Sequence, residues 1–514
     1  MRTTHWLWAS FGTIAAVGVL ASACIDPTSD CALIYACSGG VSGGTTTTTS
    51  STTGTGGGGA PPSGCVPSDS KDPVADSCGV FVSSSLGVDG NEADRGTKTK
   101  PFKTIGAALM KADVARVYAC AESFTEAVTV SAAVDLFGGL DCKGWAYVGA
   151  TKKTTLTALA NMVPLSLAGD ARIEDFAIKA ADATVDGGSS IAVIADQVKA
   201  SFARCDFVAG LGKAGLAGTT PIDPVGPMDS ADVAIKGNDG AAACMAMSSQ
   251  LGGDAKENAL CPFASGGPIG GSGGQGTVPT GGNGEANPAT TQTALGGVGQ
   301  PNLDPMSLWS CAVGNGGGQS GTNGAGGTPG DGATGVAALG TLDKAGYTGN
   351  PGQPGGLAPP GQGGGGGGGA KGKPLCAGAS GGGGGAGGCG GKGGLGGNAG
   401  GASIALVSLG ATLSFDKVTI KTGVGGDGGN GGDGQGGGVG GKGGTGGNGD
   451  VTPTATLKAC DGGAGGQGGT GGKGGGARGG HAIGIAYTGA VVPLTKGAAF
   501  TKGTAGKGGA GPPT

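Results

Sequence analysis

The chain has little histidine, few aromatic residues and few charges, and these shortages exclude several classes of protein. Only two of its 514 residues are histidines. His5 falls within an N-terminal export signal and His481 is then left alone, which excludes a histidine-based catalytic triad and a multi-histidine metal site. The 31 Lys and Arg residues are balanced by 35 Asp and Glu residues and form no basic cluster, which excludes nucleic-acid binding.

Glycine is what the chain has in abundance. It supplies 128 residues, several times the usual share, while aromatic residues make up only 4%. A large part of the chain therefore has too few side chains to build an ordinary core, and we expect the packed domain to be much smaller than the chain.

The first 23 residues have the pattern of an export signal. Arg2 precedes an apolar run, residues 6–20, that is too short and too interrupted for a membrane span, and Ala-Ser-Ala follows at 21–23. The segment from Leu20 to Cys24 resembles a bacterial lipobox. This resemblance implies a lipid on Cys24 and attachment to the outer membrane or cell surface. The alternative is ordinary cleavage before Cys24, which leaves a free thiol there in a secreted protein.

Residues 24–77 have the composition of a flexible tether. Gly and Ser dominate residues 38–44, Thr and Ser fill residues 45–53, and Gly and Pro follow at 56–62. Such a segment buries too little apolar surface to offset the entropy cost of ordering. The Thr run suits either a bare stalk or one that carries O-linked sugar. We expect the folded part to begin at Cys78.

Export makes the 14 cysteines candidates for disulfides, because the compartment beyond the membrane is oxidising. No two of them have CxxC spacing, which disfavours zinc, iron–sulfur and redox sites, so neither a metal nor a cofactor is expected. Cys205 aligns with a core valine and is expected to be a small buried side chain. The first pairing that we expect is Cys120 with Cys142. Spacing does not fix connectivity, and two further expected pairs are Cys65 with Cys78 and Cys244 with Cys261.

A strand pattern recurs in residues 190–207, 403–420 and 483–500. Inward apolar residues alternate with polar or small ones, and in the second copy the alternation breaks at Asp416 and Lys417, which predicts a corner. Three short strands per copy favour a coil in which each strand stacks in parallel on its equivalent in the next copy. The sequence therefore predicts an all-β fold, a small parallel β-helix built from 78–208, 400–422 and 479–502. The alternative is coincidental β-propensity inside disordered glycine.

The segment before these copies predicts a helical cap. Pro101 is followed by apolar residues at helical spacing, Phe102, Ile105 and Leu109. With the strands after it, the segment resembles the opening of pectin-lyase-like right-handed parallel β-helix domains, which implies that fold for about residues 78–208. The order of five further residues is similar to that in a group of bacterial surface lipoproteins: Cys120, Gly138, Gly139, Cys142 and Trp145.

Three glycine-rich tracts, 209–399, 423–478 and 503–514, follow the strand segments. Their densest parts repeat in triplets, as in residues 425–433, and three residues is the pitch of polyproline II. The tracts resemble the glycine-rich domains of PE-PGRS proteins, which implies bundled polyproline II helices whose bare glycine faces let backbones pack closely. A disordered chain is the alternative. The aspartates of the triplets lack the nine-residue period of calcium-binding repeats, so calcium is not expected.

The acidic residues do not form the cluster that a β-helix lyase or hydrolase needs. Asp196, Asp206 and Asp416 align with residues that are not acidic in the other copies. Glu174 and Asp175 are neighbours on a predicted strand, so we expect them on opposite faces. No catalytic site is therefore predicted.

Basic residues do occupy one equivalent position in all three copies of the strand pattern. Arg204, Lys417 and Lys496 fall at the same corner, which sets positive charges roughly 5 Å apart along the stack. We interpret the column as a solvated corner that also discourages edge pairing. The alternative is a contact with an anionic surface polysaccharide.

These patterns favour a non-catalytic structural or adhesive protein that is exported and lipid-anchored, with glycine-rich tracts displayed on a β-helix scaffold. Its expected partners are the membrane, through the lipid anchor, and a surface polysaccharide or a neighbouring cell surface. The alternative is a β-helix protein that binds or cleaves a polysaccharide, as a lyase or hydrolase. The two differ over a clustered acidic site.

Overall fold

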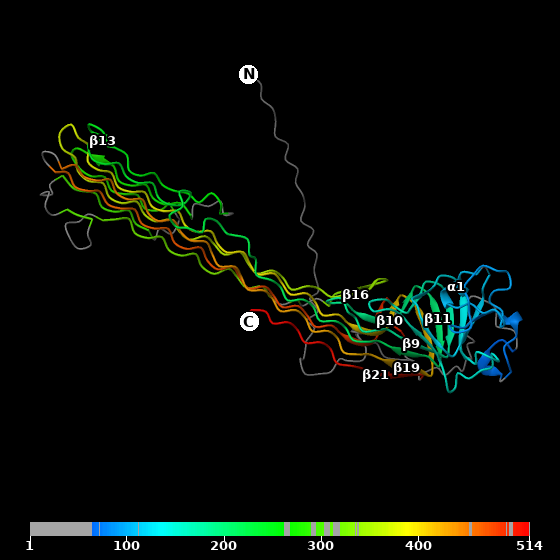
Figure 1. Cartoon of the computed structure of the whole chain (residues 1–514). Coiled ribbons are helices and arrows are strands. Elements are labelled where there is room, and N and C mark those ends of the chain that lie inside the picture. Colours follow the sequence, from blue (N-terminus) through cyan, green and yellow to red (C-terminus); the bar gives the residue numbers. More distant parts are fainter. Residues whose placement is uncertain are drawn as a thin grey trace, which may run out of the picture. The chain divides into compact units, whose positions relative to one another are not determined.

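The structure is a computed structural model that describes most of the chain from Gly64 onward. The described residues are 64–70, 72–111, 113–261, 268–288, 294–302, 309–311, 319–334, 336, 339–451, 455–489, 491–492 and 497–512. They belong to one compact unit, and the predicted signal peptide and Cys24 lie outside them. Figure 1 shows the strands of this unit and the long extended segments that leave them.

Three parallel sheets contain most of the strands. The first sheet holds, in spatial order, β1 (Val80–Val82), β2 (Arg116–Cys120), β5 (Val134–Leu140), β8 (Ala171–Glu174), β11 (Lys199–Ala203) and β18 (Thr412–Asp416). The second holds β20 (Ala482–Thr488), β17 (Ser403–Leu409), β10 (Ser190–Asp196), β7 (Leu165–Leu167) and β4 (Val128–Val130). The third holds β21 (Ala498–Thr501), β19 (Val418–Lys421), β12 (Asp206–Val208), β9 (Phe176–Lys179), β6 (Thr154–Thr157) and β3 (Ser123–Thr125).

The chain visits the three sheets in a fixed order. It runs from the second sheet to the first and then to the third in β7–β8–β9, again in β10–β11–β12, and again in β17–β18–β19. Each pass therefore adds one strand to each sheet. Since the described residues are otherwise short helices, hairpins and extended chain, the fold is all-β, as predicted.

The register between passes confirms the predicted alignment of the repeats. Equivalent inward residues pair as follows: Val193, Leu406 and Ile485 in the second sheet, Phe202 and Phe415 in the first, and Phe207, Ile420 and Phe500 in the third. Ile191, Ile404 and Ile483 also pair in register, but they pack in a separate apolar cluster and not with these inward residues. Segments more than 200 residues apart in the sequence thus share continuous ladders, because each copies the same inward apolar pattern.

Side chains from the three sheets meet in one apolar core. The ring of Phe202 lies 4.9 Å from that of Phe207 and 6.0 Å from that of Phe415, measured between centroids. All three rings are buried, and each contributes about 1.5–3 kcal/mol to stability by leaving water. Cys205 is fully buried in the same core with a free thiol, as predicted.

A short helix closes one end of this core. Helix α1 (Ile105–Leu109) begins at Thr104, whose hydroxyl accepts a hydrogen bond from the Ala107 amide, and it buries Ile105 and Ala108. The amides of Ile105 and Gly106 donate to the Glu126 carboxylate at 2.8 and 2.9 Å. The predicted cap helix is thus confirmed. Among the described residues, no helix has the length and apolar character that crossing a bilayer requires.

The packed part of the chain begins earlier than the predicted boundary at Cys78. Cys65 and Cys78 form a disulfide that flanks two 3₁₀ turns, η1 (Pro67–Asp69) and η2 (Asp76–Cys78). Val66 and Val74, which the composition placed in the tether, are buried in a small second core. This core also holds Trp145, whose carbonyl accepts a hydrogen bond from the Val74 amide at 3.1 Å.

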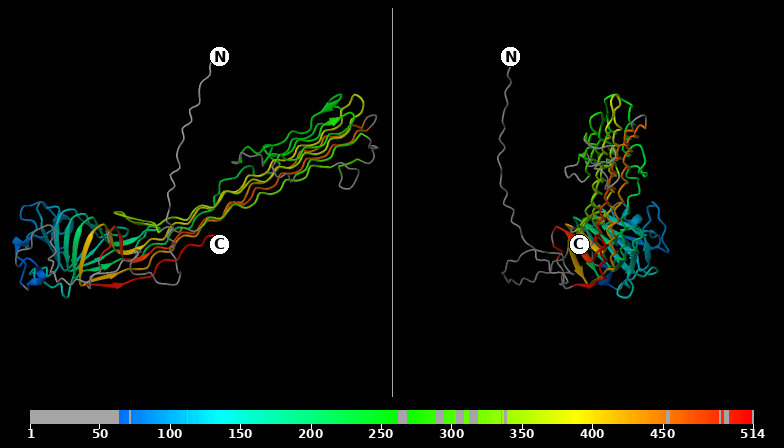
Figure 2. Two further views of the ribbon diagram at one scale, coloured as in Figure 1. Left: turned by 180° about the vertical axis from the view of Figure 1, so that it is seen from behind. Right: turned by 90° about the vertical axis from the view of Figure 1, so that its left-hand side faces the viewer.

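The glycine-rich tracts leave the third sheet and return to the second. They follow β12, β19 and β21, and the chain comes back from the first two at β17 and β20. Figure 2 shows the extended segments running side by side. Two small antiparallel strand pairs lie within the long tract, β13 (Ser249–Gln250) with β14 (Gly276–Thr277), and the hairpin of β15 (Thr341–Asp343) with β16 (Gly346–Thr348).

Residues 381–400, here named the central chain, show how the tracts are held together. Successive residues form backbone hydrogen bonds with different neighbouring chains, and the pattern repeats every three residues. The amides of Gly382, Gly385 and Gly388 donate to carbonyls of residues 460–466, while those of Gly384 and Gly387 donate to Gly271 and Pro268. The carbonyls of Gly383, Ala386 and Cys389 accept from Gly444, Gly441 and Gly438. Several neighbouring chains are thus bound by backbone groups alone.

The same period explains why two of every three residues are glycine. A Cβ on Gly384 or Gly387 would overlap a carbonyl oxygen of the chain 352–370, and one on Gly385 or Gly388 would overlap a carbonyl oxygen of the chain 426–447. The third position carries side chains instead: Ala386, Cys389, Lys392, Leu395 and Asn398. Two faces of the chain must therefore be bare so that backbones approach within hydrogen-bonding distance.

Three disulfides join distant parts of the glycine-rich tracts. They are Cys244–Cys376, Cys261–Cys389 and Cys311–Cys460, with sequence separations of 132, 128 and 149 residues. The expected pairing of Cys244 with Cys261 is therefore wrong. Each cysteine pairs across neighbouring extended chains rather than along its own chain, and the fold of the tracts, not the spacing, decides which chains are neighbours.

Candidate functional site

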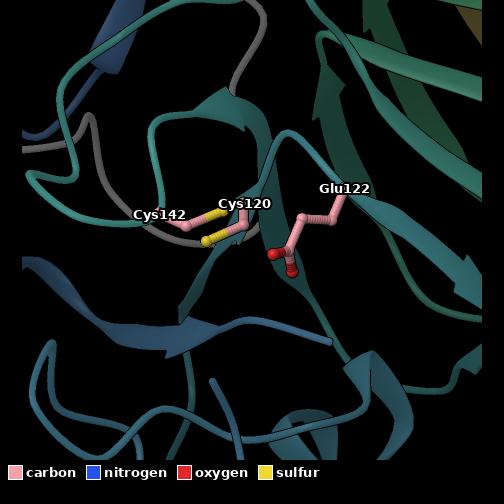
Figure 3. Close-up of side chains that lie close together, drawn as sticks. All are labelled: Cys120, Glu122 and Cys142. Carbon is pink, nitrogen blue, oxygen red and sulfur yellow. The ribbon is translucent and has the colours of Figure 1, made fainter. Parts of the chain in front are cut away.

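Two thiols and a carboxylate meet where strands β2 and β5 end. Cys120 is the last residue of β2, Glu122 lies in the turn to β3, and Cys142 follows β5. A register shift in the β2–β5 ladder sets Cys120 opposite Leu140, which brings the turn after β5 over the end of β2. Figure 3 shows the three side chains pointing toward one another, and their sulfur and oxygen atoms lie within 4.8 Å of one another.

The two thiols differ in their access to solvent. Cys120 is fully buried and Cys142 is partly exposed, and both are free cysteines. Burial raises the pKa of Cys142 to about 11, because the hydrogen bond from Cys120 lowers it less than burial and the hydrogen bond to Glu122 raise it. Burial, followed by the hydrogen bond to Cys142, also raises the pKa of Cys120. The Cys120 thiol donates to the Cys142 sulfur, and the Cys142 thiol donates to Glu122. The expected disulfide between them is thus replaced by a row of two hydrogen-bonded thiols that ends on a carboxylate.

A run of three serines holds the Glu122 carboxylate. Oε2 accepts from the hydroxyls of Ser83 and Ser84 at 3.1 and 3.0 Å and from the Ser85 amide at 3.2 Å, and the Ser85 hydroxyl donates to Oε1. Burial alone raises the pKa of Glu122, but the hydrogen bonds from Ser85, Cys142 and Ser84 outweigh burial and lower the pKa to about 2. Glu122 is therefore a fixed negative charge beside Cys142.

This arrangement has two chemical capacities. Adjacent thiols can be oxidised to a disulfide, and two sulfurs with a carboxylate oxygen can hold a soft divalent metal such as Zn²⁺. Two features of the sequence could have indicated this cluster, the Cys120-x-Glu122 spacing and the serine run at 83–85. The glutamate was missed because its partners come from a separate segment of the chain.

A second cluster of charged groups lies at the corner between the first and third sheets. The Arg204 guanidinium forms a bidentate contact with Asp175 at 3.0 and 2.9 Å and reaches Glu174 Oε2 at 2.6 Å. The Tyr147 hydroxyl donates to Asp175 at 3.1 Å, and Arg172 contacts Glu174 at 2.5 Å. Both carboxylates are about 3% exposed or less. They are thus buried and fully paired with cations.

The prediction that Glu174 and Asp175 point to opposite faces is wrong. Strand β8 ends at Glu174, and Asp175 adopts a left-handed conformation with φ of 59°. Arg204 and Lys417 occupy the same corner of later passes with φ of 54° and 52°. The strand rule of alternating faces does not apply across this turn, so both carboxylates reach one guanidinium.

The predicted column of positive charge is only partly available to a ligand. Arg204 is engaged by the two buried carboxylates, while Lys417 is exposed at the equivalent corner. Lys496, the third member, lies outside the described residues. Asp206, which aligns with residues that are not acidic in the other copies, forms an ion pair with Lys153 at 2.8 Å.

His481 has a structural environment. Its ring packs edge-on against Tyr347 at 5.6 Å, and burial, with the nearby Arg478 charge, lowers its pKa below the ordinary value. The His481 side chain is thus half-buried against an aromatic ring.

No family model, curated protein or solved structure matches this chain.

Proposed function

We propose that the chain is a non-catalytic structural or adhesive protein of the cell surface, exported and anchored through a lipid on Cys24. In this proposal the three parallel sheets form a small right-handed β-helix of the pectin-lyase-like kind, and the glycine-rich tracts form a bundle of polyproline II helices like those of PE-PGRS proteins. The bundle is the displayed part and the sheets are its scaffold.

The observation that carries the proposal is the period-three bonding of the central chain. A three-residue helix presents three faces, and the central chain uses two of them for backbone contacts made by glycine and one for side chains. Two disulfides, Cys244–Cys376 and Cys261–Cys389, further link parts of the first tract, and Cys311–Cys460 links the first tract to the second. A bundle built in this way stays ordered without a large apolar core, which suits a segment that extends from a surface.

The fixed visiting order of the three sheets supports the β-helix. Each pass contributes strands to the second, first and third sheets, and the corner between the first and third is made by left-handed residues at equivalent positions, Asp175, Arg204 and Lys417. Stacked coils of this kind bury a face that one coil alone leaves exposed.

Cleavage of a polysaccharide is the second candidate, and the meeting of Glu174 with Asp175 is the observation that favours it. Against it, Arg204 pairs with both carboxylates, and both are buried beneath the corner. The catalytic acid of a glycosidase must reach a sugar bond, so we assign the two buried carboxylates a structural role in the scaffold. We assign any contact with an anionic polysaccharide to the exposed Lys417.

Intact cells that express the full chain test the proposal. External protease followed by peptide mass spectrometry should release fragments of the protein from the cell surface, and metabolic labelling with an alkyne fatty acid should label the wild type but not Cys24→Ser. Protein that is protected from protease in intact cells, together with an unlabelled wild type, would overturn the surface-lipoprotein proposal. Hydrolysis of uronate-containing polysaccharides by the purified chain would favour the enzyme instead.

A further inference from the structure

The thiol and carboxylate cluster lies where β2 and β5 end, whereas the glycine-rich tracts follow β12, β19 and β21. Eight of the eleven described cysteines are joined in four disulfides, whereas Cys120 and Cys142 lie side by side as thiols, and Cys205 is buried alone. Cys120 and Cys142 are thus set apart from the other described cysteines by a neighbouring thiol to which they are not bonded and by the fixed carboxylate of Glu122.

We propose that Cys120 and Cys142 form a redox-active dithiol, in which Cys142 attacks a small aliphatic disulfide and Cys120 resolves the mixed disulfide. The assignment of roles follows from access. Cys142 lies on the turn after β5 and is partly exposed, so a small disulfide can reach its sulfur. Cys120 ends a central strand and is 0% exposed, so its sulfur can react only with the neighbouring Cys142.

The exchange balances as two displacements. The Cys142 thiol loses its proton to a solvent base, and its thiolate bonds to one sulfur of the small disulfide while the second sulfur leaves as a thiolate and is protonated. The Cys120 sulfur then bonds to the Cys142 sulfur and expels the remaining small thiolate, which takes up the proton that Cys120 loses. The protein loses two hydrogens and two electrons, and the small disulfide is reduced to two thiols.

Glu122 restrains the first displacement. The groups that face Cys142 are the Cys120 thiol and the carboxylates of Glu122 and Asp141, and the two carboxylates both favour the protonated thiol. The serines hold Glu122 in its charged form, so the thiolate fraction of Cys142 stays small near neutral pH. The site is therefore poised to react slowly in the wild type and faster when that charge is removed.

Differential alkylation of the full chain tests the proposal. The purified protein is equilibrated in a graded series of reduced and oxidised glutathione, trapped with maleimide and analysed by peptide mass spectrometry. We expect Cys120 and Cys142 to pass reversibly between thiols and a shared disulfide while the four other disulfides persist and Cys205, the matched buried control, stays a thiol. A pair that stays reduced throughout, or that changes only as the other disulfides change, would overturn the proposal.

Three variants assign the roles. Cys120→Ala should accumulate glutathione on Cys142, whereas Cys142→Ala should leave Cys120 unmodified in the folded protein. Glu122→Gln should speed the modification of Cys142 by about tenfold at neutral pH, because the midpoint of its pH–rate profile moves to lower pH. Equal reactivity of the two lone thiols contradicts the roles. Retention of one equivalent of Zn²⁺ through dialysis, with both thiols protected until a chelator is added, identifies a metal site instead.

Discussion

Gly387 lies directly against Gly361, and no space remains between its α-carbon and the Gly361 carbonyl oxygen for a side chain. Gly387→Ala should therefore push the two chains apart and break the neighbouring bonds, in which the Gly361 and Gly364 amides donate to Gly388 and Gly385 at 2.9 Å. Overpacking of this kind costs about 1–3 kcal/mol. Hydrogen exchange at Gly361 and Gly364 should accelerate in the variant.

Gly436→Ala is the matched control for this prediction. A Cβ at Gly436 would have no heavy atom within 4 Å, and its φ is not in the left-handed region. The substitution should change stability by less than about 1 kcal/mol, and in the stabilising direction if it changes it at all, since alanine restricts the unfolded chain. Equal acceleration of exchange in both variants would contradict tight backbone packing as the reason for the glycines.

The parts of the fold that the sequence predicted are those in which each segment carries its own copy of a pattern. Val193, Leu406 and Ile485 pair in register because the three segments share the same inward positions. The corner at Lys417 was visible for the same reason, since a break in alternation marks a turn. The glycine triplets predicted only the polyproline II pitch, and it was the resemblance to PE-PGRS proteins that implied close backbone contact.

The disulfide pairing and the two charged clusters depend on which distant segments become neighbours in the fold. The residue pattern within one segment does not specify those neighbours. Cys244 pairs with Cys376 because the extended chains fold back on one another, so spacing along the chain carried no information about the bond. The pairing of Arg204 with Asp175 required a left-handed residue directly after a strand, where the alternation rule ends. Glu122 was missed because its serine donors come from residues 83–85.

The disulfide between Cys261 and Cys389 should stabilise the bundle locally. Cys389 occupies the side-chain position of the central chain, and its carbonyl accepts from the Gly438 amide at 2.8 Å. Replacing both cysteines by alanine should cost about 2–5 kcal/mol and accelerate hydrogen exchange at Gly438. The control is the double alanine variant of Cys65 and Cys78, which lie in the N-terminal core. It should leave exchange at Gly438 unchanged, and a common effect of both variants would argue against a locally stapled bundle.

Arg204 should be indispensable to the corner it occupies. Arg204→Gln leaves the buried Glu174 and Asp175 carboxylates without their shared cation, and an uncompensated buried charge costs about 3–5 kcal/mol. Urea unfolding monitored by circular dichroism measures the loss. Lys153→Gln removes a more exposed ion pair, with Asp206, and should cost no more than about 1 kcal/mol. Neutralising both acids in the Arg204→Gln background should restore part of the stability, and its failure to do so would show that packing rather than charge is responsible.

The stability contributed by Glu122 should disappear in acid. Its pKa is lowered to about 2 in the folded protein from 4.5, so its charged form stabilises the fold fully above pH 4.5, and this stabilisation is lost as the pH falls toward 2. The free energy of unfolding of the wild type should exceed that of Glu122→Gln by about 1 kcal/mol at neutral pH, a modest value because the carboxylate is partly exposed. This difference should narrow as the pH falls.

Glu126→Gln provides a control for which the pH dependence has the opposite sign. Burial raises the pKa of Glu126 above 4.5 despite its two backbone donors. The stability of the wild type should therefore increase relative to that of Glu126→Gln as the pH falls. Unfolding curves of the three proteins between neutral pH and pH 3 measure these differences in stability. If both variants differ from the wild type with the same pH dependence, the assigned role of the serine donors is contradicted.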